Sequence, residues 1–403
     1  MSRSIVHMDL DTFFVSCVRL QNSQLNGIPI IVGGGERGVV ASCSYEARRF
    51  GVRSAMPIRM ALQLCPEAKV IKGDFELFTN KSQEVTQIIE ENAPIVEKSS
   101  IDEFYLDITG MDKFYGCYKW TNELSQTIIK ETGLPISFAL SVNKTVSKIA
   151  TGEGKPKDNL EVPEKMVQSF LNPLSIRKIP GIGEQNFKSF SQLGIRNIEK
   201  LSEMPQHYMH SMFGKIGLEL WRKANGIDNT PVQPYVERKS ISTEHTYLQD
   251  TIDIKKVKSH LISMAEKLAY QLRKEQWLPS LVVVKIRYAN FDTEVRQMKI
   301  TYTSCDHILI RYILELFDKL YNRRMRIRLI GIRFSGLARG SYQVNMFEDT
   351  VEMMSLYQTM DKIRNRFGAD AVSRCAGTKL KSKDEEEQKL PDPLKGEFYY
   401  KNQ

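Results

Sequence analysis

Short apolar runs alternate with longer amphipathic segments over the first 165 residues, a pattern that predicts a sheet with packed helices. Runs rich in Val, Ile and aromatic residues predict strands at 4–8, 38–44 and 136–142, and a strand pair at 95–97 and 103–108. Helical periodicity covers the longer segments, at 11–21, 57–65, 75–92 and 118–133. A first strand separated from the others by an insertion is typical of a split β-α-β fold of the ferredoxin type.

The composition and the predicted elements change twice beyond residue 165. Residues 166–230 are predicted to be helical and are punctuated by glycine, whereas the polar, proline-bearing residues 231–240 indicate a linker. Residues 241–340 are again mixed, with helices at 255–275 and 307–320 and strands at 281–288, 296–302 and 327–334. Residues 341–403 form a C-terminal tail, for which disorder is expected from Lys381 onward. We therefore expect an α+β protein of several domains, as the length of 403 residues allows.

Charge is unevenly distributed along the chain. The whole chain has a formal net charge of +9, and residues 238–340 alone hold 20 Lys and Arg against 10 Asp and Glu. A basic domain beside a near-neutral remainder is typical of proteins that bind a phosphate backbone, although ribosomal and membrane-surface proteins share it. The predicted DNA contacts are Lys285 and Arg287 on one strand face, and Arg326 and Arg328 on another strand. A merely solvated face is the alternative.

Several protein classes are excluded by what the sequence lacks. Its six cysteines include no Cys-x-x-Cys pair, and they are interpreted as reduced thiols of a cytosolic protein. The N-terminus has no signal-peptide pattern, and no apolar run approaches the roughly 20 residues of a membrane span. We therefore expect a soluble protein of the cytoplasm.

Two acidic clusters supply the candidate chemistry. Asp9 follows the first predicted strand, and Asp102 and Glu103 follow a predicted turn at Ser99-Ser100. Carboxylates at the edge of a core are suitable ligands for Mg2+, and two such ions about 4 Å apart stabilise the attacking and leaving oxygens of a phosphoryl transfer. A solvated turn or a helix cap is the alternative for each cluster alone, and Asp11 is interpreted as the N-cap of the next helix. Adjacent strand residues point to opposite faces, so Asp102 and Glu103 share a site only if the backbone twists there.

A glycine-rich turn in the helical middle segment predicts a contact with DNA. Gly181 and Gly183 lie in Ile179-Pro-Gly-Ile-Gly, the pattern of a helix-hairpin-helix whose turn presents backbone N–H groups to a phosphate. An ordinary helical hairpin is the alternative. A second, poorer copy is predicted to begin at Phe213.

Five motifs follow one another along the chain and together carry a family resemblance. They are His7-Met-Asp-Leu-Asp-Thr-Phe-Phe, Ser44-Tyr-Glu-Ala-Arg-Arg-Phe-Gly-Val-Arg-Ser-Ala-Met-Pro, Ser100-Ile-Asp-Glu-Phe-Tyr-Leu-Asp, Ser147-Lys-Ile-Ala and Lys178-Ile-Pro-Gly-Ile-Gly. In this order they resemble the Y-family translesion DNA polymerases of the DinB type over about residues 5–340.

The resemblance implies a right-hand polymerase that copies damaged templates with low fidelity. Its ferredoxin-like palm would comprise residues 1–10 and 75–165 and its small fingers residues 11–74. The helix-hairpin-helix thumb would comprise residues 166–230 and the α+β little finger residues 241–340. Primer-template DNA and dNTPs would be its substrates, and we expect a monomer.

The resemblance also implies roles for individual residues. Asp9 and Asp102 would bridge two Mg2+ ions, Glu103 would hold the ion that activates the primer 3′-hydroxyl, and the Leu10 carbonyl would complete the nucleotide-side ion. The remaining matches are Tyr45, Arg48 and Lys155 on the triphosphate, Phe14 as the steric gate against ribonucleotides, with Phe13 in the core, and Val39, Ala41 and Ser42 as a small roof over the nascent base pair. Two positions depart from the family pattern: Val18-Arg19 replaces a carboxylate, and Thr151-Gly-Glu-Gly precedes Lys155.

A short peptide and three rival functions complete the interpretation. Gln343, Met346 and Phe347 resemble the peptide that bacterial polymerases insert into the sliding clamp, with a buried strand end as the alternative. A nucleotidyl cyclase would lack the helix-hairpin-helix and the basic domain. A non-catalytic DNA-binding scaffold would tolerate loss of the three carboxylates, which this chain keeps. A subunit active only within a mutagenic complex stays open.

Overall fold

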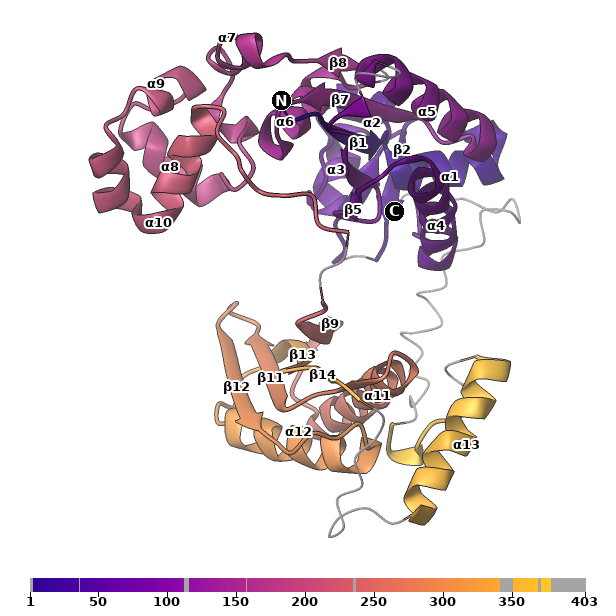
Figure 1. Cartoon of the computed structure of the whole chain (residues 1–403). Coiled ribbons are helices and arrows are strands. Elements are labelled where there is room, and N and C mark those ends of the chain that lie inside the picture. The colour runs from indigo at the N-terminus through magenta and orange to yellow at the C-terminus, as the bar shows by residue number, and fades with distance from the viewer. Residues whose placement is uncertain are drawn as a thin grey trace. The chain divides into compact units, whose positions relative to one another are not determined.

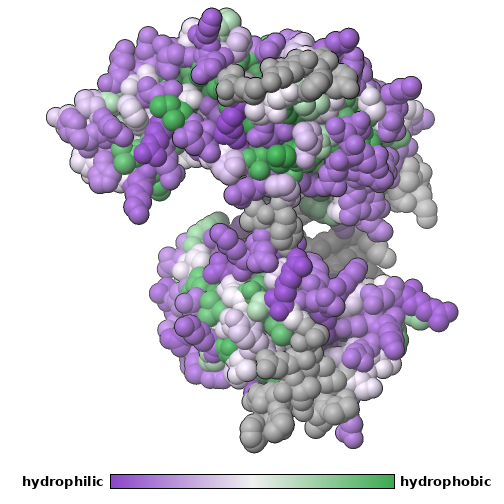
Figure 2. All heavy atoms as spheres, in the orientation of Figure 1, coloured by the Kyte–Doolittle hydropathy of each residue, from purple (hydrophilic) through white to green (hydrophobic). Residues whose placement is uncertain are grey.

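The computed structural model describes residues 3–35, 37–111, 116–156, 158–234, 237–340, 351–368 and 371–377. The chain divides into two compact units, residues 1–236 and 237–403 (Figure 1). Hydrophilic side chains dominate the visible surface of both units, with hydrophobic ones scattered among them (Figure 2). Of the described residues, no helix is both long enough and apolar enough to span a membrane.

A five-stranded sheet lies at the centre of the first unit. β1 (Ile5–Leu10) pairs antiparallel with β6 (Glu103–Asp107) on one side and with β7 (Ile136–Ser141) on the other. β5 (Val96–Lys98) extends one edge, and β8 (Leu160–Glu161) joins the other edge in parallel. The ferredoxin-like palm predicted from the split pattern is thus present, with β8 as an unpredicted edge strand.

Helices cover both faces of this central sheet. One face packs against α4 (Phe75–Asn92) and α5 (Cys117–Thr132), in a core that α1 (Phe13–Gln21) also enters. The other face is covered by α6 (Lys144–Gly154), which was not predicted. Since neither face is solvated, every residue of β7 is buried.

A second, smaller sheet has its own core. It contains β2 (Ile30–Gly33), β3 (Val40–Cys43) and the unpredicted β4 (Lys69–Ile71), packed with α2 (Tyr45–Arg49) and α3 (Ile58–Leu64). Arg19 of α1 reaches Glu46 of α2, with 3.0 Å between Nη2 and Oε2, and donates to the carbonyls of Leu25 and Ile28. At the position where the chain departs from the family pattern, Arg19 therefore links α1 to α2 by an ion pair, while Val18 is buried in the core.

The helical segment contains two glycine-dependent turns. Its helices are α7 (Val167–Leu171), α8 (Glu184–Gln192), α9 (Ile198–Ser202) and α10 (Gln206–Ala224). Gly181 has φ of 104°, and α8 begins directly after Gly183, as the hairpin pattern predicts. The first helix of the hairpin is only the 3-10 turn Ile176–Lys178. Within α10, Gly214 has φ of 62° and ψ of −146°, so the predicted second copy also contains a sharp turn.

The second unit is built on a four-stranded antiparallel sheet with the order β12-β11-β13-β9. Its strands are β9 (Ser240–Thr251), β11 (Leu281–Tyr288), β12 (Thr293–Lys299) and β13 (Ile327–Ser335). The helices α11 (Ile254–Lys274) and α12 (Asp306–Leu320) pack on one face. A two-stranded ladder joins β10 (Trp277–Leu278) to β14 (Ala338–Arg339). The strand β9, which begins in the predicted linker, was missed.

A further helix, α13 (Val351–Phe367), lies in the segment that the sequence analysis assigned to the tail. Tyr357 of α13 is buried against Cys305 and Ile308. Arg273 of α11 donates to Asp361 of α13 at 2.6 Å and also contacts the buried Asp306. This helix is therefore packed on the second unit. The predicted clamp peptide at 343–347 and the segment from Lys381 onward lie outside the described residues.

Candidate active site

Strand register brings two of the predicted carboxylates together. Asp9 of β1 lies opposite Glu103 of β6, and on its other side it lies opposite Ser137 of β7. The flanking residues Met8 and Leu10 are buried in the core on the α4 and α5 side. Because strand residues alternate between faces, Asp9 and Glu103 both face α6. The sheet thus presents two neighbouring carboxylates on one face.

The third carboxylate, Asp102, lies in a bend directly before β6 rather than within the strand. Its carbonyl accepts a 3.0 Å hydrogen bond from the Leu10 N–H. The Ser100 hydroxyl donates to Asp102 Oδ1 at 2.6 Å and accepts from the Glu103 N–H at 3.1 Å. Strand alternation does not apply in a bend, so the directions of the Asp102 and Glu103 side chains are not restricted to opposite faces of the sheet.

A cation from the α6 segment contacts each of the paired carboxylates. Lys148 Nζ is 2.6 Å from Glu103 Oε2, and Lys155 Nζ, directly after α6, is 2.5 Å from Asp9 Oδ1. Burial raises the pKa of Asp9 to about 6 against the opposing charge of Lys155, and the Glu103 and Asp102 carboxylates raise it further. The ionised form of Asp9 is therefore poorly compensated by Lys155 alone.

The donor set at this place fits a hard divalent cation, because it consists of carboxylate oxygens and the Leu10 carbonyl. In the part of the chain that the structure describes, no three acidic, His or Cys side chains are gathered closely enough to hold an ion as they stand. The Lys155 ammonium contacts Asp9 instead. One of the two carboxylate oxygens of Asp9 is therefore already paired with a cation.

The predicted triphosphate ligands of α2 share one helix face. The Ser44 hydroxyl accepts from the Ala47 N–H at 3.3 Å and so caps the helix. The Arg48 guanidinium lies 4.9 Å from the centroid of the Tyr45 ring. Burial raises the pKa of Tyr45 to about 12, and the Asp11 carboxylate contributes to the same direction while Arg48 opposes it. Among the described residues, the buried Tyr45 hydroxyl has no hydrogen-bond partner.

The predicted steric gate is held in an aromatic cluster. Phe14 stacks on Phe78 with 4.3 Å between ring centroids and meets Phe75 edge-on at 6.0 Å. Phe13 is buried in the core, as predicted, whereas Phe14 is half-buried. Of the predicted roof residues, Ser42 is half-buried and Val39 and Ala41 are exposed.

Asp11 is not a helix cap, and that prediction is wrong. The helix begins at Phe13 after Thr12, whose backbone is left-handed with φ of 45°. The Asp11 N–H donates to the Pro135 carbonyl at 2.8 Å, which continues the pairing of β1 with the strand segment before β7. Asp11 is 2% exposed and accepts a 2.9 Å hydrogen bond from the Ser137 hydroxyl. The two-residue spacing from Asp9 was the signal for this, since residues i and i+2 of a strand share a face.

Among the described residues, helices pack on one face of the basic sheet, and no helix packs on its other face. Lys285 and Arg287 are partly exposed on this face, as alternation predicts, and the register places them beside Gly331 and Leu329 of β13. Arg333, two positions further along β13, is exposed on the same face and was not predicted. Lys285 Nζ is 2.8 Å from Glu244 of β9.

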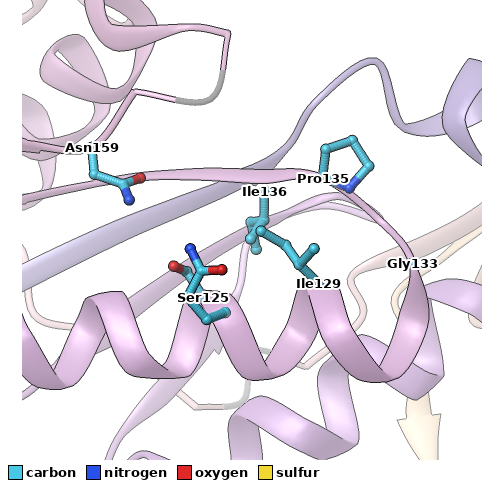
Figure 3. Close-up of a pocket in the computed structure, with 7 residues that line it drawn as sticks. Ser125, Ile129, Gly133, Pro135, Ile136 and Asn159 are labelled. Carbon is cyan, nitrogen blue, oxygen red and sulfur yellow. The ribbon is translucent and has the colours of Figure 1, made fainter.

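The other two predicted DNA contacts lie elsewhere. Arg328, at an irregularity of β13, stacks over Phe291 at 4.6 Å and is 4.0 Å from Asp250, while Arg326 precedes the strand. A cavity of about 370 Å³ between α5 and β7 contains none of the predicted site residues (Figure 3). Ser125, Ile129, Pro135 and Asn159 line it.

Comparison with known proteins decides the family. A DNA polymerase IV of Dehalococcoides mccartyi (strain CBDB1) is 34% identical over 384 residues, which cover 94% of this chain and 98% of that protein. Residues 8–152 match the impB/mucB/samB family, and residues 238–346 match the C-terminal domain of the same family. The chain belongs to the impB/mucB/samB family.

Further relatives of this impB/mucB/samB chain agree with that assignment. A DNA polymerase IV of Alkaliphilus oremlandii (strain OhILAs) is 34% identical and covers 93% of this chain and 99% of the relative. A solved structure of a chimeric Y-family DNA polymerase is 25% identical, covers 84% of this chain and 100% of the solved one, and superposes with a TM-score of 0.74. The predicted fold class is therefore confirmed. Membership also implies a divalent-metal-dependent enzyme.

Proposed function

We propose that this impB/mucB/samB protein is a template-directed DNA polymerase for translesion synthesis, which transfers a nucleotidyl group from a dNTP to a primer 3′-hydroxyl. The observation that carries the proposal is the placement of Asp9 of β1 opposite Glu103 of β6, with the Asp102 carbonyl hydrogen-bonded to Leu10 at the end of β1. Phosphoryl transfer asks a protein mainly for positioning and for neutralisation of charge. Paired carboxylates at the end of a covered sheet supply both once cations are bound.

Asp9, Asp102, Glu103 and the Leu10 carbonyl would hold two Mg2+ ions. Such ions neutralise the charge of the phosphates and lower the pKa of the attacking hydroxyl. The protein groups have separate tasks: Lys148 orients Glu103, and Lys155 leaves Asp9 to meet the incoming triphosphate.

The nucleotide would lie between the two sheets of the first unit. Tyr45 and Arg48 share one face of α2. This face would contact the triphosphate, and Lys155 would contact it from the end of α6. Stacking on Phe78 keeps the Phe14 ring in place, so a 2′-hydroxyl would be excluded by collision. The roof residues Val39, Ala41 and Ser42 are small, which leaves room for damaged template bases and accounts for low fidelity.

DNA would be held by backbone contacts outside the site. The glycine turn at Gly181 and Gly183 would approach a phosphate, and Lys285, Arg287 and Arg333 would neutralise phosphates along the open sheet face. Arg326, Arg328 and the clamp peptide at 343–347 keep the roles predicted from sequence. We further propose a monomer acting in the bacterial cytoplasm.

Primer extension with Mg2+ on plain and lesion-bearing templates tests this function. Asp102→Ala should lower nucleotide incorporation by roughly 10³-fold or more, because a ligand of the reacting centre is lost, while primer-template affinity stays within about twofold. Asp107→Asn, further along β6, is the matched control and should retain full activity. Synthesis retained by Asp102→Ala would refute the metal assignment.

Sugar selection tests the gate separately. Phe14→Ala should admit ribonucleotides roughly 100-fold more readily, because the collision with the 2′-hydroxyl is removed. The measurement is the ratio of specificity constants for a dNTP and the matching rNTP. Phe13→Leu is the control, since Phe13 lies in the core. An unchanged ratio in Phe14→Ala would remove the gate role.

A further inference from the structure

Asp11 is a buried acid that the proposed chemistry does not use, and three parts of the chain meet at it. Its carboxylate accepts from the Ser137 hydroxyl of β7 at 2.9 Å. Lys155 Nζ, after α6, lies 3.8 Å from Asp11 Oδ1. Lys155, a proposed triphosphate ligand, therefore lies beside this buried carboxylate.

Lys155 is shared unequally between two acids. Its ammonium is 2.5 Å from Asp9 and 3.8 Å from Asp11, and its side chain is 21% exposed. A buried carboxylate is costly unless a cation or hydrogen-bond donors compensate it. Once a divalent ion occupies Asp9, Asp11 is the acid that remains close to Lys155.

We propose that Asp11 is a positioning residue that holds the Lys155 ammonium in place for an incoming triphosphate. This inference rests on the proposed function, because it assumes that Lys155 binds the nucleotide. Asp11 itself touches no substrate in this scheme. Its carboxylate attracts the ammonium, and the bond from Ser137 fixes the orientation of the carboxylate.

The test is nucleotide affinity without chemistry. Asp11→Asn keeps the shape of the side chain and an oxygen for Ser137, so it removes the charge alone. Dissociation constants for dNTP are measured by equilibrium fluorescence on a complex with a dideoxy-terminated primer-template and Ca2+. The expected result is roughly 10-fold weaker dNTP binding, with primer-template affinity changed by less than about twofold.

Two comparisons separate positioning from a merely structural role. Ser137→Ala removes a bond to Asp11 but leaves its charge, so its effect on dNTP affinity should be several times smaller than that of Asp11→Asn. In a Lys155→Met background, Asp11→Asn should lose most of its effect, because the group it positions is gone. Full additivity of Asp11→Asn and Lys155→Met would overturn the proposal, as would an unchanged dNTP affinity in folded Asp11→Asn.

A second route applies if Asp11→Asn does not fold. Ser137→Ala and Lys155→Met are then combined in the otherwise intact chain. In this scheme Ser137 acts on the nucleotide only through Asp11 and Lys155, so the joint loss of dNTP affinity should equal that of Lys155→Met alone. A joint loss equal to the product of the two single losses refutes the positioning. Failure of the proposed function looks different, since wild-type protein would then neither bind dNTP in this complex nor extend a primer.

Discussion

The central sheet of the first unit and the basic sheet of the second unit use charge in opposite ways. The first is covered on both faces, and the acids Asp9 and Glu103 each contact one lysine at 2.5–2.6 Å. The second is covered on one face only, and its other face displays basic residues at the surface. A few partly buried charges act strongly through position, whereas exposed charges act through their number.

The two sheets use charge differently because water surrounds their charges to different extents. Coulomb interactions are weak and screened by salt where water surrounds both charges, and they are much stronger where protein replaces the water. The pKa of Asp9, raised by burial to about 6, shows that desolvation dominates in the covered sheet. On the open sheet, Lys285 has a partner in Glu244 that is itself 46% exposed. Removal of one lysine should therefore have unequal consequences in the two sheets.

Between the two sheets, the largest expected difference comes from the matched pair Lys148→Met and Lys285→Met. Lys148→Met leaves Glu103 without its 2.6 Å partner, and we expect the single-turnover rate to fall by roughly 10- to 100-fold. Lys285→Met removes an exposed ion pair, and we expect less than about a twofold change at low salt. Both are measured by rapid-quench incorporation with saturating DNA. Equal effects of the two variants would contradict the predicted difference between the covered sheet and the open sheet.

A smaller effect is expected on stability from Asp9→Asn. The folded pKa of Asp9 is raised from 3.8 to about 6, so the wild-type acid favours the fold fully below pH 4 and loses that contribution as pH rises through 6. At pH 8 the variant should therefore be more stable than wild type by about 2 kcal/mol, and the advantage should shrink towards pH 4. Metal-free thermal or urea denaturation across this pH range measures it. A variant destabilised equally at all pH values would contradict the burial argument.

The smallest effect should appear in salt dependence on the open face. Replacing Lys285, Arg287 and Arg333 by Ala should weaken primer-template binding by roughly 10-fold at low salt. The slope of log affinity against log salt should fall by about one for each lost phosphate contact. Replacing the acidic Glu244 by Gln tests the same face with the opposite sign and should tighten binding slightly. A salt slope unchanged by the triple substitution would show that this face does not meet the phosphate backbone.

Regular, strongly periodic elements were predictable from sequence, and polar ones were not. The boundaries of α4 and β11 agree with the predicted ranges, because their apolar positions repeat cleanly. The strand β9 was missed because most of its residues are polar, and only pairing with β13 stabilises it as a strand. The helix α6 was missed because its buried stripe is short and two glycines lie near its end. Its lysines nevertheless provide the partners of the predicted acids.

The sequence alone determined the order of the motifs, the candidate acids Asp9, Asp102 and Glu103, and the basic character of residues 238–340. These follow from residue identity and local spacing. Tertiary structure decided which acids are paired with lysines. It also showed that Asp11, predicted to be a helix cap, is buried beside Ser137 and Lys155. It also decided which face of the basic sheet is open and added Arg333 to it. The reason is that burial and cross-strand partners depend on residues more than 100 positions apart, such as Asp11 and Ser137, whose proximity no local pattern encodes.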